Sequence, residues 1–161
     1  MEQLGLSWDV KIYATADLKT EHFLKNVSPN GFAPVIEDPN TGVKIWESGA
    51  INTYLLETYD KENSLTFPAS EVQKRAEVSQ WSFFQATAQG PHLSAALYFG
   101  RFNPNAEAKK RYINESIRVL DVLERSLKTV EGSEKWLVGG KMTAADLAFL
   151  PYTWSMPVSL S

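Results

Sequence analysis

Two adjacent side chains in the sequence could recognise a charged ligand. Glu47 and Ser48 stand directly before Gly49, where a helix is predicted to begin. A helix N-terminus presents free backbone N–H groups, and with the Ser48 hydroxyl it favours a carboxylate ligand. Glu47 could pair with an ammonium beside that carboxylate, and a ligand with both groups on one carbon is an α-amino acid. The alternative is structural: Ser48 caps the helix and Glu47 favours its dipole.

A second feature is Pro34, which enters a predicted strand directly after Ala33. Proline lacks a backbone N–H and cannot donate to a strand ladder, so its position is typical of an edge or first strand residue. A cis-proline that turns the Ala33 backbone outward is the second interpretation. Only about 5–6% of X–Pro bonds are cis, so position alone does not favour it.

Composition limits the other chemistry. The chain of 161 residues has no cysteine, which excludes disulfides, thiol nucleophiles and thiolate metal sites. His22 and His92 are its two histidines, so neither a histidine metal site nor a Ser-His-Asp triad is expected. We therefore expect no metal, and expect a bound small molecule to supply much of any chemistry.

Charge and hydropathy exclude further classes. With 16 Lys+Arg and 19 Asp+Glu the net charge is −3, and no basic cluster suits a nucleic acid. No stretch approaches 18 apolar residues and the N-terminus lacks a basic region, so neither a membrane span nor a secretory signal is expected. These features predict a globular cytoplasmic protein that binds neither nucleic acid nor membrane.

The first half of the sequence predicts strands and two helices. Alternating apolar residues predict a strand over 8–12, and two runs across a turn predict a hairpin of strands 33–37 and 43–46. A short helix over 20–26 should bury Phe23 and Leu24. The helix after Glu47 should run to about Tyr59 and positions the candidate site.

The second half predicts helices alone. Residues 60–69 are polar and without periodicity, which is typical of a linker. Capping signals predict helices that start at Ser70, Asn103 and Thr143, and Gly90-Pro91 should kink or end the first of them. Thr143 with Asp146 is interpreted as a capping box of purely structural role.

These features together resemble the cytosolic glutathione transferase family. The resemblance covers nearly the whole chain. It rests on the following stretches: Phe23-Leu24-Lys25, Ser28 to Gly31, Ala33-Pro34, Trp46 to Ile51, Tyr54-Leu55, Gln80-Trp81, Phe83 to Gln85, Gly90-Pro91 and Thr143 to Asp146. The second-half motifs resemble the fungal and bacterial branch related to the yeast nitrogen-catabolite regulator.

The resemblance implies an α/β domain followed by an all-α domain. Residues 1–62 would form a thioredoxin-like glutathione-binding domain, 63–69 a linker and 70–161 an all-helical C-terminal domain. The family's first strand and helix, which carry the catalytic residue, would fall before Met1, so no catalytic residue is assigned. The chain is thus expected to be incomplete at both ends, as a shortened gene model, a splice form or a diverged paralogue.

The resemblance also implies roles for named residues. Pro34 would be a cis-proline, and Ala33 would pair its main chain with the cysteinyl backbone of glutathione. Glu47 and Ser48 would hold the γ-glutamyl ammonium and carboxylate. Lys19 or His22 would reach the glycine carboxylate. Phe32 stands where the branch often has a basic residue, so one charge-assisted contact would be lost.

The implied function is conjugation of glutathione, as co-substrate, to an electrophilic small molecule by a homodimeric enzyme. The setting would be secondary-metabolite biosynthesis or detoxification. Four aromatic residues would line the electrophile site or simply form core: Phe84, Tyr98, Phe99 and Phe102. The alternatives are a non-catalytic glutathione-binding or regulatory relative, and a glutathione-dependent disulfide reductase.

Overall fold

A computed structural model of the chain describes residues 1–160, with side chains through Ser155. The chain divides between Ser64 and Leu65 into two compact units. The C-terminal residue of the predicted helical domain, Ser161, lies outside the described residues. Each unit has its own arrangement of elements, and each is described by itself.

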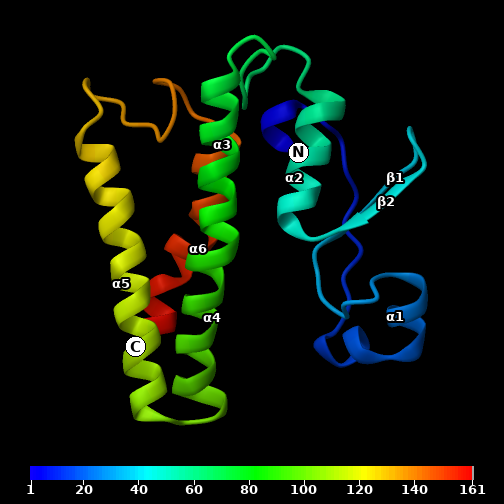
Figure 1. The fold of residues 1–161 in the computed structure, drawn as a ribbon. Helices are drawn as coiled ribbons and strands as arrows, with labels where there is room; N and C mark the ends of the chain where they lie inside the picture. The colour runs from blue at the N-terminus through cyan, green and yellow to red at the C-terminus, as the bar shows by residue number, and fades with distance from the viewer. Residues whose placement is uncertain (161) are drawn as a thin grey trace. The chain divides into compact units, whose positions relative to one another are not determined.

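The first unit is built around a β-hairpin and one helix (Figure 1). Strand β1 (Val35–Asp38) pairs antiparallel with β2 (Val43–Trp46), with Val35 opposite Trp46 and Asp38 opposite Val43. Helix α2 (Ser48–Tyr59) follows β2 directly and buries Ile51 and Leu55. The predicted hairpin and the helix after it are confirmed.

The predicted strand over 8–12 is wrong. The segment has no regular structure, and Trp8, Val10 and Ile12 are all exposed. Within residues 1–160 the sheet consists of β1 and β2 alone. An alternating pattern forms a strand only where a neighbouring strand takes up its backbone hydrogen bonds, and no described strand does so here.

A short helix, α1 (Glu21–Asn26), follows two short 3₁₀ helices, Glu2–Leu4 and Thr15–Lys19. The Thr20 hydroxyl caps α1 by accepting from the Phe23 N–H at 3.3 Å. Phe23 is buried as predicted, but Leu24 is 36% exposed. Neighbouring residues on a helix point about 100° apart, so this two-turn helix buries one of them and not both.

The second unit is a helical bundle that starts with one long column (Figure 1). Helix α3 (Val72–Phe84) continues through a π-helical turn, Gln85–Gln89, into α4 (Gly90–Leu97) and a second π turn, Tyr98–Phe102. The α-helical winding thus changes to a π turn before Gly90-Pro91, and the column continues through these two residues rather than ending at them. The wider turn accommodates Pro91, which has no N–H to donate to the preceding turn.

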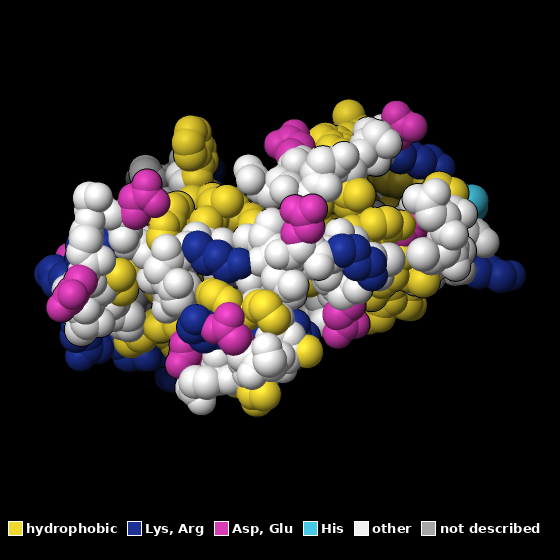
Figure 2. Space-filling view, turned by 90° about the horizontal axis from the view of Figure 1, so that it is seen from above, with side chains coloured by type: hydrophobic (Ala, Val, Ile, Leu, Met, Phe, Trp, Pro, Cys, Tyr) yellow, Lys and Arg dark blue, Asp and Glu magenta, His cyan; other side chains and the backbone are white. Residues whose placement is uncertain are grey.

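Two further helices pack on this column. Helix α5 (Ala106–Lys128) runs beside α4, and α6 (Ala144–Leu160) packs against both α3 and α4 (Figure 1). A cluster of buried side chains forms the core: Phe67, Val78, Val138 and Ala145, with Trp81 and Leu137 against it. Apolar side chains also reach the surface among charged ones (Figure 2).

The helix starts differ from the predicted caps in two of three cases. Helix α3 begins after Glu71 rather than at Ser70, without a side-chain cap. Asn105, not Asn103, caps α5 by accepting from the Ala108 N–H at 2.9 Å. At α6 the Asp146 carboxylate accepts from the Thr143 N–H at 2.8 Å, which is the predicted half of the capping box.

Candidate functional site

The predicted site residues lie at one end of the hairpin. Val35 is paired with Trp46, so the residues just before Val35 and just after Trp46 meet at the same end of the two strands. These are Ala33 and Pro34 on one side and Glu47 on the other. The Ala33–Pro34 peptide bond is cis, as the resemblance implies.

Glu47 occupies an unusual backbone position at this end. It is the N-cap of α2, with φ 73° and ψ 118°. A residue other than glycine with positive φ is uncommon, and such residues cluster at functional sites. The Glu47 Oε1 atom accepts a hydrogen bond from the Asn30 side-chain amide at 3.2 Å. The backbone therefore holds an exposed carboxylate at the start of the helix.

Ser48 is the first residue of α2 and not its cap, which corrects the structural interpretation of this residue. The Glu47 carbonyl accepts the first helical hydrogen bond, from the Ile51 N–H at 2.8 Å. The N–H groups of the three residues between them have no acceptor within the helix. With the exposed Ser48 hydroxyl they form a set of donors suited to a carboxylate.

Lys19 approaches the same end from a separate segment. Its Nζ atom donates to the Asn30 carbonyl at 3.3 Å and lies 3.6 Å from the centroid of the Phe32 ring. An ammonium over an aromatic face is a cation–π contact. The charge that the sequence lacks at Phe32 is therefore present nearby, carried by Lys19.

His22 is engaged elsewhere, on its own helix. Its Nδ1 atom and its carbonyl both contact the Asn26 side-chain amide, at 3.3 and 2.9 Å. Lys19 and His22 were the two basic residues predicted to bind the glycine carboxylate. Of these, Lys19 lies next to the turn that contains Asn30. His22 has its contacts at Asn26.

Asn30 is a site residue that the sequence analysis missed. It connects both charged groups, donating to Glu47 and accepting from Lys19. The sequence points to Asn30 only as part of the predicted turn 28–31. This turn ends at Gly31, which has φ 67°. A Cβ on Gly31 would lie 2.8 Å from the Leu18 carbonyl oxygen, so the close approach of this turn to residues 18–19 requires glycine.

Phe84, one of the four aromatic residues considered for an electrophile site, packs as core. Its ring lies 5.9 Å from Trp81 and 6.4 Å from Phe149. Phe99 stacks on Tyr112 at 5.8 Å. Tyr98 and Phe102 stack on each other and are 49% and 74% exposed, so these two have free apolar surface.

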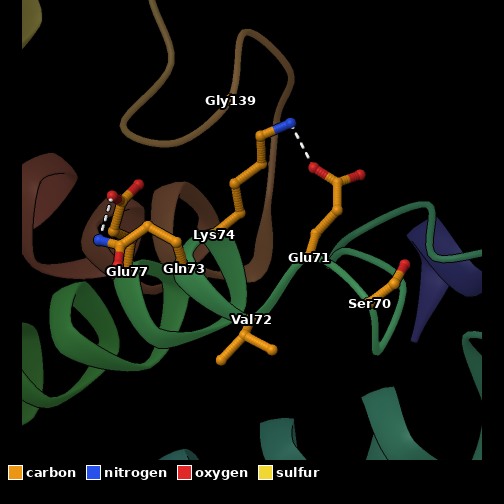
Figure 3. Close-up of a pocket in the computed structure, with 7 residues that line it drawn as sticks. All are labelled: Ser70, Glu71, Val72, Gln73, Lys74, Glu77 and Gly139. Carbon is orange, nitrogen blue, oxygen red and sulfur yellow. Dashed lines mark hydrogen bonds and ion pairs between the residues drawn. The ribbon is translucent and has the colours of Figure 1, made fainter.

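A wide cavity of about 560 Å³ lies at the start of α3 and contains none of the predicted residues (Figure 3). Its charged side chains satisfy one another: Lys74 pairs with Glu71, and Gln73 donates to Glu77 at 2.8 Å. Val72 points away from the Gly139 loop (Figure 3). The cavity is thus lined mainly by charged and amide side chains that pair with one another.

None of the described helices is long and apolar enough to cross a membrane. Within the part of the chain that the structure describes, no three metal-ligating side chains come together.

Comparison with known proteins identifies the family. The model of the glutathione S-transferase N-terminal domain matches residues 2–57, and that of the C-terminal domain matches residues 90–159. The glutathione S-transferase-like protein gedE of Aspergillus terreus is 38% identical over 162 residues, covering 97% of this chain and 70% of gedE. The similar protein tpcF of Aspergillus fumigatus is 43% identical over 132 residues, which cover 78% of this chain and 58% of tpcF.

A solved structure of Ure2p in complex with glutathione aligns with 98% of this chain and 76% of its own, at a TM-score of 0.89 and 29% identity. The chain thus spans somewhat more than half to three quarters of the proteins it matches. The shared fold is a small thioredoxin-like unit with two antiparallel strands, followed by a helical unit. The chain belongs to the glutathione S-transferase family.

Proposed function

We propose that the chain binds glutathione at the end of the hairpin and that the protein conjugates it to an electrophilic small molecule. The observation that carries this proposal is the position of Glu47. Its carboxylate stands at the N-terminus of α2, held by Asn30, beside the cis Ala33–Pro34 bond. A carboxylate and free helix N–H groups side by side complement an ammonium and a carboxylate on one carbon.

Each residue has a distinct role in the proposed complex. The Glu47 carboxylate pairs with the γ-glutamyl ammonium, while Ser48 and the first N–H groups of α2 hold the neighbouring carboxylate. Ala33, directly before the cis bond to Pro34, pairs its main chain with the cysteinyl backbone as a neighbouring strand would. Lys19 reaches the glycine carboxylate, with His22 as the alternative, and its contact with Phe32 supports the choice of Lys19.

The proposed reaction is a substitution. The glutathione thiol loses its proton to solvent, the thiolate attacks an electrophilic carbon, a thioether forms and the leaving group departs with its electron pair. The residue that would stabilise the thiolate is not assigned in this chain. The proposal includes a role in secondary-metabolite biosynthesis or detoxification, a cytoplasmic location and a homodimer, all resting on family membership.

Calorimetric titration with glutathione tests the binding site. Glu47→Gln keeps the shape of the side chain but loses its charge. A hydrogen bond to a charged group is worth about 1.5–3 kcal/mol, so affinity should fall roughly 10- to 150-fold.

Glu57→Gln is the matched control, because it removes the same charge from an exposed position on the same helix. Equal affinity of the wild type and Glu47→Gln, or equal losses in both variants, would contradict the proposed site.

A second candidate is a glutathione-binding protein without conjugating activity, and the similar structure of Ure2p with bound glutathione supports its binding part. Incubation with glutathione and an aryl halide separates the two. Conjugate formed above the uncatalysed rate, and lost in Glu47→Gln, supports the transferase. Binding without turnover supports the second candidate, and a mixed-disulfide substrate reduced under the same conditions would indicate a disulfide reductase.

A further inference from the structure

The Glu47 side chain is held from a separate turn of the first unit. The Asn30 side-chain amide donates to the Glu47 Oε1 atom at 3.2 Å, across 17 positions of the sequence. Both residues are exposed, and a hydrogen bond that water can replace contributes little to the stability of a fold. What the bond does change is the orientation of the carboxylate at the start of α2.

The turn that carries Asn30 is fixed by its own contacts. The Gly31 N–H donates to the Ser28 carbonyl at 3.0 Å, and Lys19 Nζ donates to the Asn30 carbonyl at 3.3 Å. A Cβ on Gly31 would lie 2.8 Å from the Leu18 carbonyl oxygen, so the turn packs closely on the segment before it. The side-chain amide therefore extends from a backbone that is already in place.

A neutral donor at position 30 leaves the charge of Glu47 available. The amide engages one carboxylate oxygen, and Oε2 stays open to a second donor. A lysine or arginine at this position would neutralise the carboxylate, and an aspartate would repel it. None of the ion pairs between described side chains includes Glu47. An ammonium group thus meets a carboxylate that keeps its full charge.

The contact also removes freedom from a flexible side chain. Glutamate loses conformational entropy when a ligand orders it, and this cost weakens binding. The backbone of Glu47, at φ 73°, sets the direction in which its side chain leaves the chain. The bond from Asn30 holds the far end of the same side chain. The carboxylate is therefore ordered before the ligand arrives.

We propose that Asn30 is a positioning residue for glutathione, whose amide orients Glu47 toward the γ-glutamyl ammonium without taking up its charge. In this role Asn30 acts through Glu47 rather than on the ligand itself. The inference rests on the proposed function and adds the residue that prepares the γ-glutamyl end of the site. It treats the glycine end as a separate contact, made by Lys19.

Asn30→Leu tests this role, because leucine keeps the branched shape and loses the donor. Calorimetric titration should show that the affinity for glutathione falls roughly 2- to 10-fold, the cost of ordering one side chain on binding. Asn40→Leu is the matched control. It makes the same change at an exposed asparagine of the hairpin turn, where the amide contacts Tyr59, and should leave the affinity unchanged.

Two results would overturn the inference while the proposed function stands. These are a wild-type affinity in Asn30→Leu, and an equal loss in Asn40→Leu. A wild-type chain that does not bind glutathione would contradict the proposed function itself, so the two failures are distinguishable.

A double variant shows whether Asn30 acts through Glu47. In Glu47→Ala there is no carboxylate to orient, so the further change Asn30→Leu should cause no additional loss of affinity. Independent effects of the two substitutions would instead multiply. Multiplied losses would mean that Asn30 acts by another route, which contradicts the proposal.

A shorter ligand identifies the end of the site that Asn30 serves. γ-Glutamylcysteine lacks the glycine, so Asn30→Leu should weaken this dipeptide and glutathione by the same factor. Lys19→Met, which removes the ammonium and keeps most of the stem, should weaken glutathione alone. A loss confined to glutathione in Asn30→Leu would assign Asn30 to the glycine end and refute the proposed role.

Nuclear magnetic resonance tests the contact without a ligand. The side-chain amide signal of Asn30 is identified by its absence in Asn30→Leu. This signal should shift in Glu47→Ala and stay in place in Glu57→Gln, which changes an exposed carboxylate on the same helix. A signal that does not respond to Glu47→Ala would show that the hydrogen bond is absent in solution, and the inference would fail whatever the affinity for glutathione.

Discussion

At the scale of single residues, Asp38 is the most perturbed group described in the chain. The Tyr54 hydroxyl donates to its Oδ2 atom at 2.5 Å, and the Tyr59 hydroxyl donates to the same atom. These bonds, with the Tyr54 bond the larger cause, lower the pKa of Asp38 from 3.8 to about 2. The contact ties the hairpin turn to α2 and so fixes the end of the hairpin opposite the candidate site.

The pH dependence of stability follows from this shift. The folded form holds Asp38 charged below the pH at which the unfolded chain takes up the proton. Its stabilisation is therefore complete above about pH 4 and is lost as pH falls toward 2. Urea unfolding of the wild type should show midpoints that fall across this window.

The double variant Tyr54→Phe/Tyr59→Phe should have lower stability near pH 6 and a smaller loss between pH 4 and 2. A pH dependence as steep as that of the wild type would show that the two phenols do not hold the carboxylate.

At the scale of elements, Asp146 connects the start of α6 to the loop before it. Its Oδ1 atom accepts from the Leu137 N–H at 2.9 Å, and its Oδ2 atom accepts from the Thr143 N–H and hydroxyl. Thr143 is fully buried, so its donors have no access to water when the carboxylate is removed.

Asp146→Ala should therefore lower the free energy of unfolding by roughly 1.5–3 kcal/mol. Asp121→Ala, at an exposed position on α5, should change it by less than about 0.5 kcal/mol. Chemical denaturation of both variants provides the measurement. A loss for Asp146→Ala no larger than for Asp121→Ala would show that the carboxylate has no bridging role.

The elements also show what the sequence could and could not predict. The hairpin and α2 follow from local alternation and turn residues, which act within a few positions. Segment 8–12 has the same alternation, but a strand depends on a partner that local pattern does not reveal. The caps at Ser70 and Asn103 were each misplaced by one or two residues, because several residues near each helix start are good cap formers.

The candidate site, too, could be predicted from the sequence only in part. Glu47, Ser48 and Pro34 stand next to recognisable local signals. The links from Asn30 to Glu47 and from Lys19 to Asn30 join residues 17 and 11 positions apart. Such contacts depend on tertiary packing and have no signature in spacing.

At the scale of the whole molecule, the chain divides into two units between Ser64 and Leu65, inside the polar stretch 60–69. The residues after this boundary are packed into the second unit. Leu65, Thr66 and Phe67 are buried, and Phe67 belongs to the core of the second unit. Lys74 and Lys141 lie over its ring, 5.1 and 4.6 Å from the centroid. Residues 65–67 are thus part of the packed structure of the helical unit.

Phe67→Ala should accordingly behave as a core truncation and cost about 3–5 kcal/mol of unfolding free energy. Ser70→Ala, exposed three residues later, should be close to neutral. Thermal and urea unfolding should rank the two variants in this order. Near-equal stability of the two would mean that 65–67 contributes little to the core.

The π-helical turns have a consequence for insertions and deletions in the column 72–102. Each π turn holds one residue more per hydrogen-bonded ring than an α-helical turn does. Removing a single residue from 85–89 would let the column return to α-helical winding, and the residues after it would keep nearly the same orientation. Leu93 and Ala96, which are 1% and 0% exposed, would still face the core. The column should therefore tolerate the loss of one residue in this turn far better than a loss within α3 or α4, where every later residue would rotate by about 100°.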